Sequence, residues 1–123
     1  MKLKLDCVFA ETDAYGTVKM EVNGTEELAG MLDGMDVAGF HFEARAEGSG
    51  AVVFVEGDGL SDKVTPNYAG KVGTAVFQIG FKKEPGRKTA SILNVFLRKA
   101  AKVLEKSGTG CNALLVKGVE ALA

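Results

Sequence analysis

The residues best suited to chemistry in this chain are basic and hydroxyl side chains at the start of a predicted helix. The helix is expected to begin near residue 87, where free backbone N–H groups and the helix dipole already favour an anion. Cations there cost about 0.3–1 kcal/mol each unless an anion offsets them. The candidate ligands for a phosphate or carboxylate are Arg87, Lys88, Thr89 and Ser91, preceded by Lys82 and Lys83. The alternative is a basic loop whose charges point into water.

A second group of cations follows one flank of the same helix. Steps of about 100° per residue place these cations together beside the apolar arc of the helix. They are Arg98, Lys99, Lys102 and Lys106. Such a stripe suits a phosphate backbone or an acidic protein surface. The alternative is a solvated face whose cations complement the helix dipole, because they lie toward the C-terminal end.

Nucleic acid is the less favoured partner for this stripe. Base stacking needs aromatic side chains near the cations, but the chain has no Trp, and Tyr15 and Tyr68 both fall in predicted loops of the acidic half. The sequence carries no zinc-finger, helix-turn-helix or ribonucleoprotein-type motif. Binding to nucleic acid would therefore be sensitive to salt and independent of base sequence.

Residues for catalysis or metal binding are sparse. His41 is the single histidine and falls on the polar side of a predicted strand, whereas Cys111 is spaced with apolar residues and has no local base. The acidic loop at 56–62 offers oxygen ligands but lacks the spacing of an EF-hand. No glycine pattern typical of nucleotide-binding loops is present. We therefore expect no enzyme activity, no cofactor and no metal.

The chain divides its charge unevenly. Residues 1–80 carry six basic and thirteen acidic side chains, a net of −7, and residues 81–123 carry nine basic and three acidic ones, a net of +6. The formal charge of the whole chain, −1, conceals this separation. Segments of opposite sign indicate electrostatic recognition, either of an acidic partner or of a second copy of the chain.

Hydrophobic periodicity predicts the elements that carry these residues. Alternation of apolar and polar residues predicts strands at 2–10, 17–23, 40–47, 51–55 and 72–82. Helical spacing predicts a short helix at 25–35 with Thr25 as its N-cap, and a long helix at 87–106 that Gly108 stops. Weaker helical spacing at 111–122 predicts a short final helix, with a strand at 113–116 as the alternative.

These elements predict the α+β class in a single domain, residues 1–123. The expected sheet has five mainly antiparallel strands, in the element order β-β-α-β-β-β-α-α, with helices packed on one face. A chain of 123 residues with 46% apolar content has enough material for one core. Val8, Val76 and one side of 51–55 fall on the outer face of the sheet, where either a second copy or the loop at 57–70 is expected to cover them.

Cysteine and apolar content indicate a reduced, cytoplasmic protein without membrane insertion. Cys7 and Cys111 do not define a disulfide framework, and the spacing leaves open whether they pair. The longest apolar stretch, 51–55, is far shorter than the ~20 residues that cross a bilayer. The expected function is a small non-enzymatic interaction protein that engages a protein partner or a second copy through its charged surfaces. The alternatives are a nucleic-acid-associated protein using 87–106 and a small enzyme or ligand carrier with a pocket between sheet and helices.

Overall fold

The computed structural model describes residues 1–57, 69–72, 75–80 and 86–122, and within these ranges the chain forms strands and two helices of the α+β class. The strands are β1 (Lys2–Thr12), β2 (Val18–Glu21), β3 (Met35–Val37), β4 (Phe40–Glu47), β5 (Gly50–Glu56), β6 (Ala69–Val72), β7 (Ala75–Ile79) and β8 (Ala113–Leu122). The helices are α1 (Thr25–Leu32) and α2 (Arg87–Lys106).

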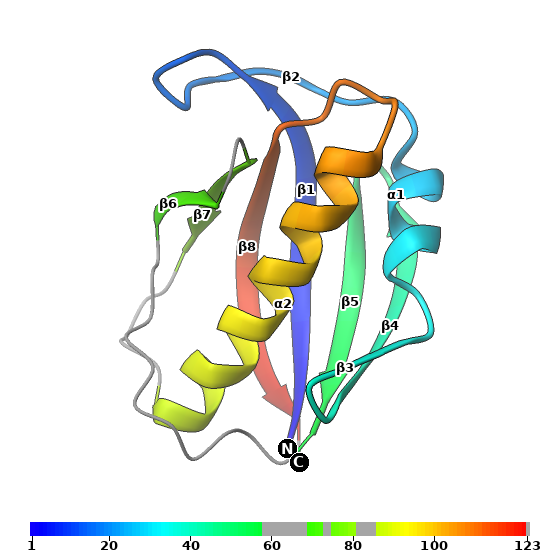
Figure 1. The fold of residues 1–123 in the computed structure, drawn as a ribbon, viewed down its shortest axis with the longest axis vertical. Coiled ribbons are helices and arrows are strands. Elements are labelled where there is room, and N and C mark those ends of the chain that lie inside the picture. Colours follow the sequence, from blue (N-terminus) through cyan, green and yellow to red (C-terminus); the bar gives the residue numbers. More distant parts are fainter. Residues whose placement is uncertain (58–68, 73–74, 81–85, 123) are drawn as a thin grey trace.

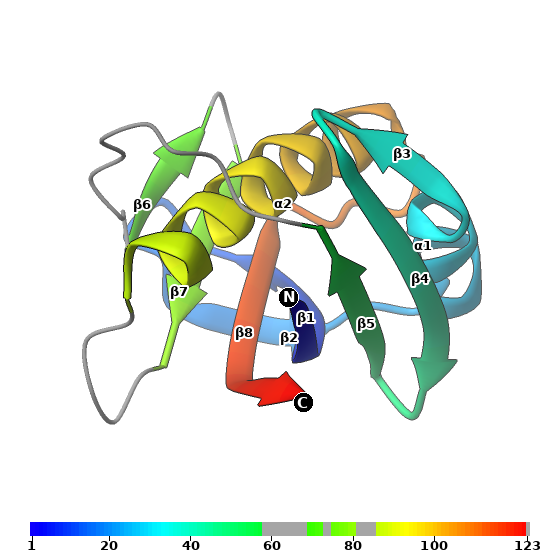
Figure 2. The same ribbon diagram turned by 90° about the horizontal axis from the view of Figure 1, so that it is seen from below.

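All the described strands belong to one mixed sheet. Hydrogen-bonded neighbours follow the order β3-β4-β5-β1-β8-β7-β6, and β2 pairs with β1 beside this path. The sheet curves round α2, with β6 and β7 on one side of the helix and β3 and β4 on the other (Figure 2). Helix α2 crosses the concave face of the sheet, and α1 packs beside β4 (Figure 1).

The first strand follows its predicted alternation. Leu3, Leu5 and Phe9 are fully buried against the helices, while Asp6 on the opposite face is exposed. Strand β5 lies between β4 and β1, so both of its edges are hydrogen-bonded. Its apolar residues are buried on both faces except Phe54, which is half-buried, and this two-sided burial explains the uninterrupted apolar run at 51–55.

Helix α2 supplies most of the helical side of the core. Its apolar arc faces the sheet, and Phe96 packs edge-on against Phe42 of β4 at 5.9 Å between ring centroids. Such an edge-to-face pair adds about 0.5–1.5 kcal/mol beyond the area it buries. The predicted range 87–106 is confirmed. The helix ends at Lys106, two residues before Gly108, because Ser107 is extended and its hydroxyl donates to the carbonyl of Leu104.

The first helix differs from prediction at both ends. Its N-cap is Gly24, which adopts φ 92°, and Thr25 is a buried residue of the first turn. The helix stops at Leu32, because Asp33 turns to extended backbone and Gly34 takes φ 73°. Met35, which shares the helical spacing, therefore begins the short strand β3.

The prediction of a final helix is wrong, and the alternative of a strand is right. β8 pairs with β1 on one edge and with β7 on the other, and its first four residues are all buried. A register shift between Asp6 and Cys7 of β1 leaves Lys117 as an extra residue in β8. This bulge moves the core-facing alternation from Val116 to Val119, which hid the period of two in the sequence.

The predicted α+β class is confirmed, but the predicted sheet of five mainly antiparallel strands has too few strands and misses a parallel pair. β7 and β8 pair in parallel, because α2 carries the chain back to the end of the sheet where β7 began. The sheet is therefore mixed. The unpredicted strands β3 and β6 each pair with their sequence neighbour as a hairpin, and β8 takes the place of the expected final helix. Of the expected strand at 72–82, Val72 instead ends β6 and residues 75–79 form β7, with residues 73–74 and 81–82 outside the described ranges.

On the described part of the sheet's outer face, two of the expected apolar residues are covered to different degrees: Val8 is half-buried and Val52 is buried. Val52 is 5% exposed, and a second small cluster of Ala10, Ala113 and Leu115 is also buried, with Val8 packed against it. The side chain of Val76 and most of the 57–70 loop lie outside the described residues. No helix within the described ranges is long and apolar enough to cross a membrane.

Candidate functional site

Four predicted cations lie together on the exposed face of α2. Arg98, Lys102 and Lys106 follow one another at a spacing of four residues, and Lys99 lies beside Lys102. Arg98, Lys102 and Lys106 are exposed, and Lys99 is half-buried. Residues four apart stack on one helix face, so the rigid helix holds these charges in a fixed row. We call Arg98, Lys99, Lys102 and Lys106 the cationic face.

The cationic face has no internal counter-charge within the described part of the chain. The ion pairs formed there involve His41 alone, and no described carboxylate lies within 4.0 Å of these four side chains. Like charges four residues apart destabilise a helix by about 0.2–0.5 kcal/mol per pair. Glu105, the one acidic residue of α2, is exposed and makes no such contact. The helix thus carries unrelieved repulsion on this face.

A groove runs beside the cationic face. It encloses about 180 Å³ between α2 and the turn that joins β3 to β4. Val37 and Ala38 line it from the turn, and Val95, Arg98, Lys99 and Lys102 line it from α2. The groove therefore combines an aliphatic lining with the cations of the helix.

The turn beside the groove has an unusual backbone. β3 and β4 are joined by Ala38 and Gly39 alone, and both residues have positive φ, 51° and 83°. Two-residue turns with positive φ at both positions match the twist of a hairpin, but they favour Asn, Asp or Gly at the first position. Alanine in this left-handed region costs about 1–2 kcal/mol.

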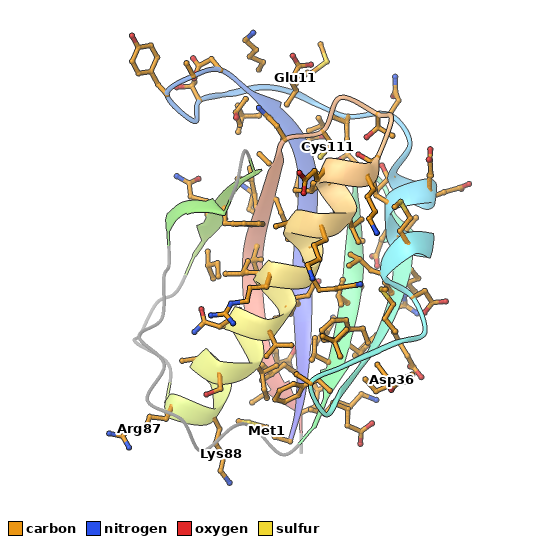
Figure 3. The ribbon with its side chains drawn as sticks, in the orientation of Figure 1. Met1, Glu11, Asp36, Arg87, Lys88 and Cys111 are labelled. Carbon is orange, nitrogen blue, oxygen red and sulfur yellow. The ribbon has the colours of Figure 1, made fainter. Side chains whose placement is uncertain are left out.

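The start of α2 is separate from the cationic face. Arg87 and Lys88, the first two residues of α2, are exposed and point away from the body of the molecule (Figure 3). Thr89 is half-buried. Ser91 is buried, and its hydroxyl donates to the carbonyl of Arg87 at 3.0 Å, so it does not point into solvent with the cations. A rise of 1.5 Å per residue sets Arg87 about 16 Å from Arg98 along the axis. Lys82 and Lys83 lie outside the described residues.

Helix α2 also holds one unsatisfied polar group. The side-chain nitrogen Nδ2 of Asn94 is buried and has no hydrogen-bond partner in the described structure. A buried amide without a partner costs about 1–3 kcal/mol.

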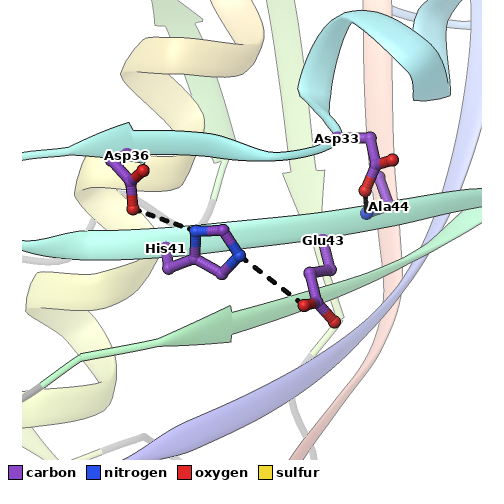
Figure 4. A network of polar contacts seen from close by, with 5 residues as sticks. All are labelled: Asp33, Asp36, His41, Glu43 and Ala44. Carbon is purple, nitrogen blue, oxygen red and sulfur yellow. Dashed lines mark hydrogen bonds and ion pairs between the residues drawn. The ribbon is translucent and has the colours of Figure 1, made fainter.

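The single histidine joins two exposed strands on the acidic side of the molecule. His41 Nδ1 lies 2.9 Å from Asp36 Oδ1 across the β3–β4 hairpin, and its Nε2 lies 3.6 Å from Glu43 Oε1 (Figure 4). The hydrogen bond to Asp36 raises the pKa of His41 above 6.5, with further support from the charge of Glu43. Nearby, Asp33 Oδ1 accepts the backbone N–H of Ala44 at 2.9 Å and ties the end of α1 to β4.

The two cysteines are free thiols in the core. Burial raises the pKa of Cys7 far above its usual range and raises the pKa of Cys111 as well. Cys111 Sγ donates to the carbonyls of Ala10 and Ala113, both at 3.4 Å. A buried thiol with a raised pKa forms little thiolate, which is the reactive species. Within the described ranges, no three acidic, histidine or cysteine side chains are grouped to hold a metal ion. Asp58 and Asp62 of the acidic loop are not among the residues described.

Sequence reasoning located the cationic face but missed the groove. The missing wall is the β3–β4 turn, because a three-residue strand gives almost no periodic signal and Ala-Gly is a weaker turn signal than Asn-Gly or Asp-Gly. The burial of Ser91 was also not predicted. Ser91 lies one helical turn after the exposed Arg87, so its angular position on the helix suggested that it shares the exposed side.

Comparison with known proteins relates the fold, but not the sequence, to an enzyme. No family model matches the chain, and no curated protein matches it in sequence. A solved structure, the cofactor-independent phosphoglycerate mutase from Thermoplasma acidophilum, superposes with a TM-score of 0.63 at 23% identity. The match covers 96% of this chain and 36% of the mutase chain. At this identity the likeness shows that the fold is shared, and this chain spans about a third of the length of that enzyme.

Proposed function

We propose that this chain is a small non-enzymatic recognition protein that binds an acidic protein partner through the cationic face of α2. The observation that carries the proposal is a row of four cations on a rigid helix with no described carboxylate within 4.0 Å. A partner that supplies carboxylates relieves the repulsion along this row and gains charge-assisted contacts at the same time.

The acidic surface elsewhere on the molecule orients such a partner. Exposed carboxylates gather on α1, β3 and β4, and they repel an acidic surface that approaches from that side. Complementary and repulsive patches on one protein raise the association rate and fix the docking orientation. The same arrangement makes a second copy of the chain the alternative protein partner, because one copy offers carboxylates to the cations of the other.

The test is the binding of a fluorescein-labelled oligoglutamate peptide, followed by anisotropy at low salt. We expect the double variant Lys99→Ser and Lys102→Ser to lose several-fold in affinity, as two surface charge contacts contribute about 0.2–1 kcal/mol each. The matched control removes two exposed lysines on other strands, Lys19 of β2 and Lys117 of β8, and leaves the same net charge. An equal loss in both variants would show attraction by net charge alone and would overturn the proposal.

Two further ligands in the same assay address the other partners. Duplex DNA that binds more tightly than oligoglutamate, and that depends on the same two lysines, would replace the protein partner with nucleic acid. Sedimentation of the unlabelled protein tests self-association. A dimer that dissociates in the Lys99→Ser, Lys102→Ser variant, and not in the control, would identify the partner as a second copy.

A second candidate function is a ligand-carrying part of an enzyme that handles phosphorylated carboxylates. The observation that favours it is the fold shared with part of a phosphoglycerate mutase, together with the exposed Arg87 and Lys88 at the start of α2. Phosphoglycerate should then shift the amide resonances of residues 86–90, and glycerate, which lacks the phosphate, should not. Shifts of equal size with both compounds, or none, would remove this candidate.

A further inference from the structure

The groove beside the cationic face has the dimensions of a single side chain. Its volume of about 180 Å³ is small for a binding pocket. Pockets for whole small-molecule ligands are larger, about 300–1,000 Å³. Three aliphatic residues line it, Val37 and Ala38 from the turn and Val95 from α2, so a polar occupant would leave its hydrogen bonds unmade there.

The strained residue Ala38 is a second observation at the same place. Glycine at this position would adopt φ 51° without the steric cost that a Cβ atom imposes. The chain instead carries an alanine there, and this residue lines the groove. Backbone strain of this kind is concentrated at ligand-binding positions, and the inference runs from the observed outlier to a function.

We infer that the groove receives one aliphatic side chain of an acidic peptide segment, whose flanking carboxylates contact Arg98, Lys99 and Lys102. This inference rests on the proposed function and adds a specificity pocket to it. The aliphatic lining favours a peptide over a nucleic acid, because no aromatic side chain among the described residues lines the groove to stack on a base. The cations bring an acidic segment to the helix, and the groove selects among such segments.

Two labelled peptides of equal charge test the inference. One is a run of aspartate and glutamate with a central leucine, and the other has glycine in place of the leucine. We expect the wild-type protein to prefer the leucine peptide by about tenfold, because the groove removes most of that side chain from water. The variant Val95→Ser should reduce this preference to about twofold and leave the affinity for the glycine peptide unchanged.

Two additional variants make the result interpretable. Val8→Ser replaces another half-buried valine, far from α2 in the chain and on the outer face of the sheet, and should keep the full preference. Ala38→Asn suits the left-handed backbone and places an amide in the groove, so it should fold well and lose the preference even if Val95→Ser does not fold.

The outcomes separate the two proposals. Equal affinity of the wild-type protein for both peptides would overturn the specificity pocket and leave recognition by the cationic face standing. Binding of both peptides that is insensitive to Lys99→Ser and Lys102→Ser would overturn the proposed function itself. A preference for leucine that survives both Val95→Ser and Ala38→Asn would place the aliphatic contact outside this groove.

Discussion

Two regions of this molecule carry charges of equal size and opposite sign. Residues 25–47, which form α1, β3 and β4, hold six carboxylates and one arginine, a net of −5. Residues 86–106, which form α2, hold six cations and one glutamate, a net of +5. The two regions differ in how many of these charged side chains contact other groups within the fold.

The acidic region uses several of its charges within the fold. Asp33 accepts a backbone N–H at the end of α1, and Asp36 and Glu43 flank His41 across the β3–β4 hairpin. Glu26 and Glu27 lie in the first turn of α1, where the helix dipole favours negative charge. Lys106 has a comparable use, because it lies in the last turn of α2, where the helix dipole favours positive charge. Arg98, Lys99 and Lys102 have none in the described structure, which is why we propose that they bind a partner. Position and partners, more than net charge, therefore decide which charges stabilise the fold.

Reversing the charge of the cationic face should have the largest effect. Lys99→Glu with Lys102→Glu should weaken binding of an acidic peptide by about 30-fold, because two attractions of about 0.5 kcal/mol become repulsions of similar size. The melting temperature should not fall, since the new carboxylates relieve repulsion from Arg98 and Lys106. Anisotropy and thermal denaturation check both statements. A lower melting temperature in this variant would contradict the view that Lys99 and Lys102 do not stabilise the fold.

Removing a carboxylate that makes a hydrogen bond within the fold should lower stability, in contrast to the charge reversal on α2. Asp33→Ala should lower the free energy of unfolding by about 1 kcal/mol, because the Ala44 N–H loses a charged acceptor. Urea denaturation with an unchanged slope measures this loss. Asp33→Asn keeps a carbonyl acceptor and should lose less. Lys106→Ala on α2 is the comparison across regions, and it should change stability little.

A substitution on the buried side of α2 should stabilise the protein. Asn94→Leu should raise the free energy of unfolding by about 1 kcal/mol, since it replaces an unpartnered buried amide with an apolar group of similar size. Asn94→Asp should act in the opposite direction by placing a carboxylate there. If Asn94→Leu is destabilising, the amide has a partner that the described residues do not include.

The strained turn beside the groove should respond in the same direction, but more weakly. Ala38→Gly should raise the free energy of unfolding by about 0.5 kcal/mol, which is the relief of left-handed strain less the greater entropy of glycine in the unfolded chain. The matched change Ala101→Gly within α2 should cost about 1 kcal/mol, because glycine weakens a helix interior. A loss of stability at position 38 would mean that Ala38 is not strained.

The smallest expected effect is the titration of His41. Its pKa is raised in the folded protein by the bond to Asp36, so its contribution to stability is fully present below about pH 6.5 and is lost as pH rises through the folded pKa. NMR titration should give a pKa above 6.5 for the wild type and a lower one for Asp36→Asn. The stability difference between these two proteins should shrink toward high pH. An unshifted pKa in the wild type would show that the contact is absent in solution.

Long periodic segments could be predicted from the sequence, and short or interrupted ones could not. The range of α2 and the alternation in β1 repeat over enough residues to define one period. A strand at 113–116 was only the alternative to a final helix, because burial on both faces at the start of β8 removes polar markers and the bulge at Lys117 shifts the phase. The position of the cations on one face of α2 could be predicted from the rotation of about 100° per residue in a helix. The wall of the groove that faces α2 could not be predicted, because it follows the short strand β3. Met35 of β3 continues the helical spacing of α1, so the sequence pattern predicted helix where the strand begins.

The first and last strands of the chain are immediate neighbours in the sheet. Lys2 lies opposite Leu122, and the amino group of Met1 donates to the carbonyl of Gly57 at 2.9 Å. A short flexible linker could therefore join residues 1 and 122 without disturbing the sheet, and new ends could be opened at the β4–β5 turn around Ser49. Such a circularly permuted protein would present both of its ends at the opposite pole, where a reporter domain could be fused clear of α2.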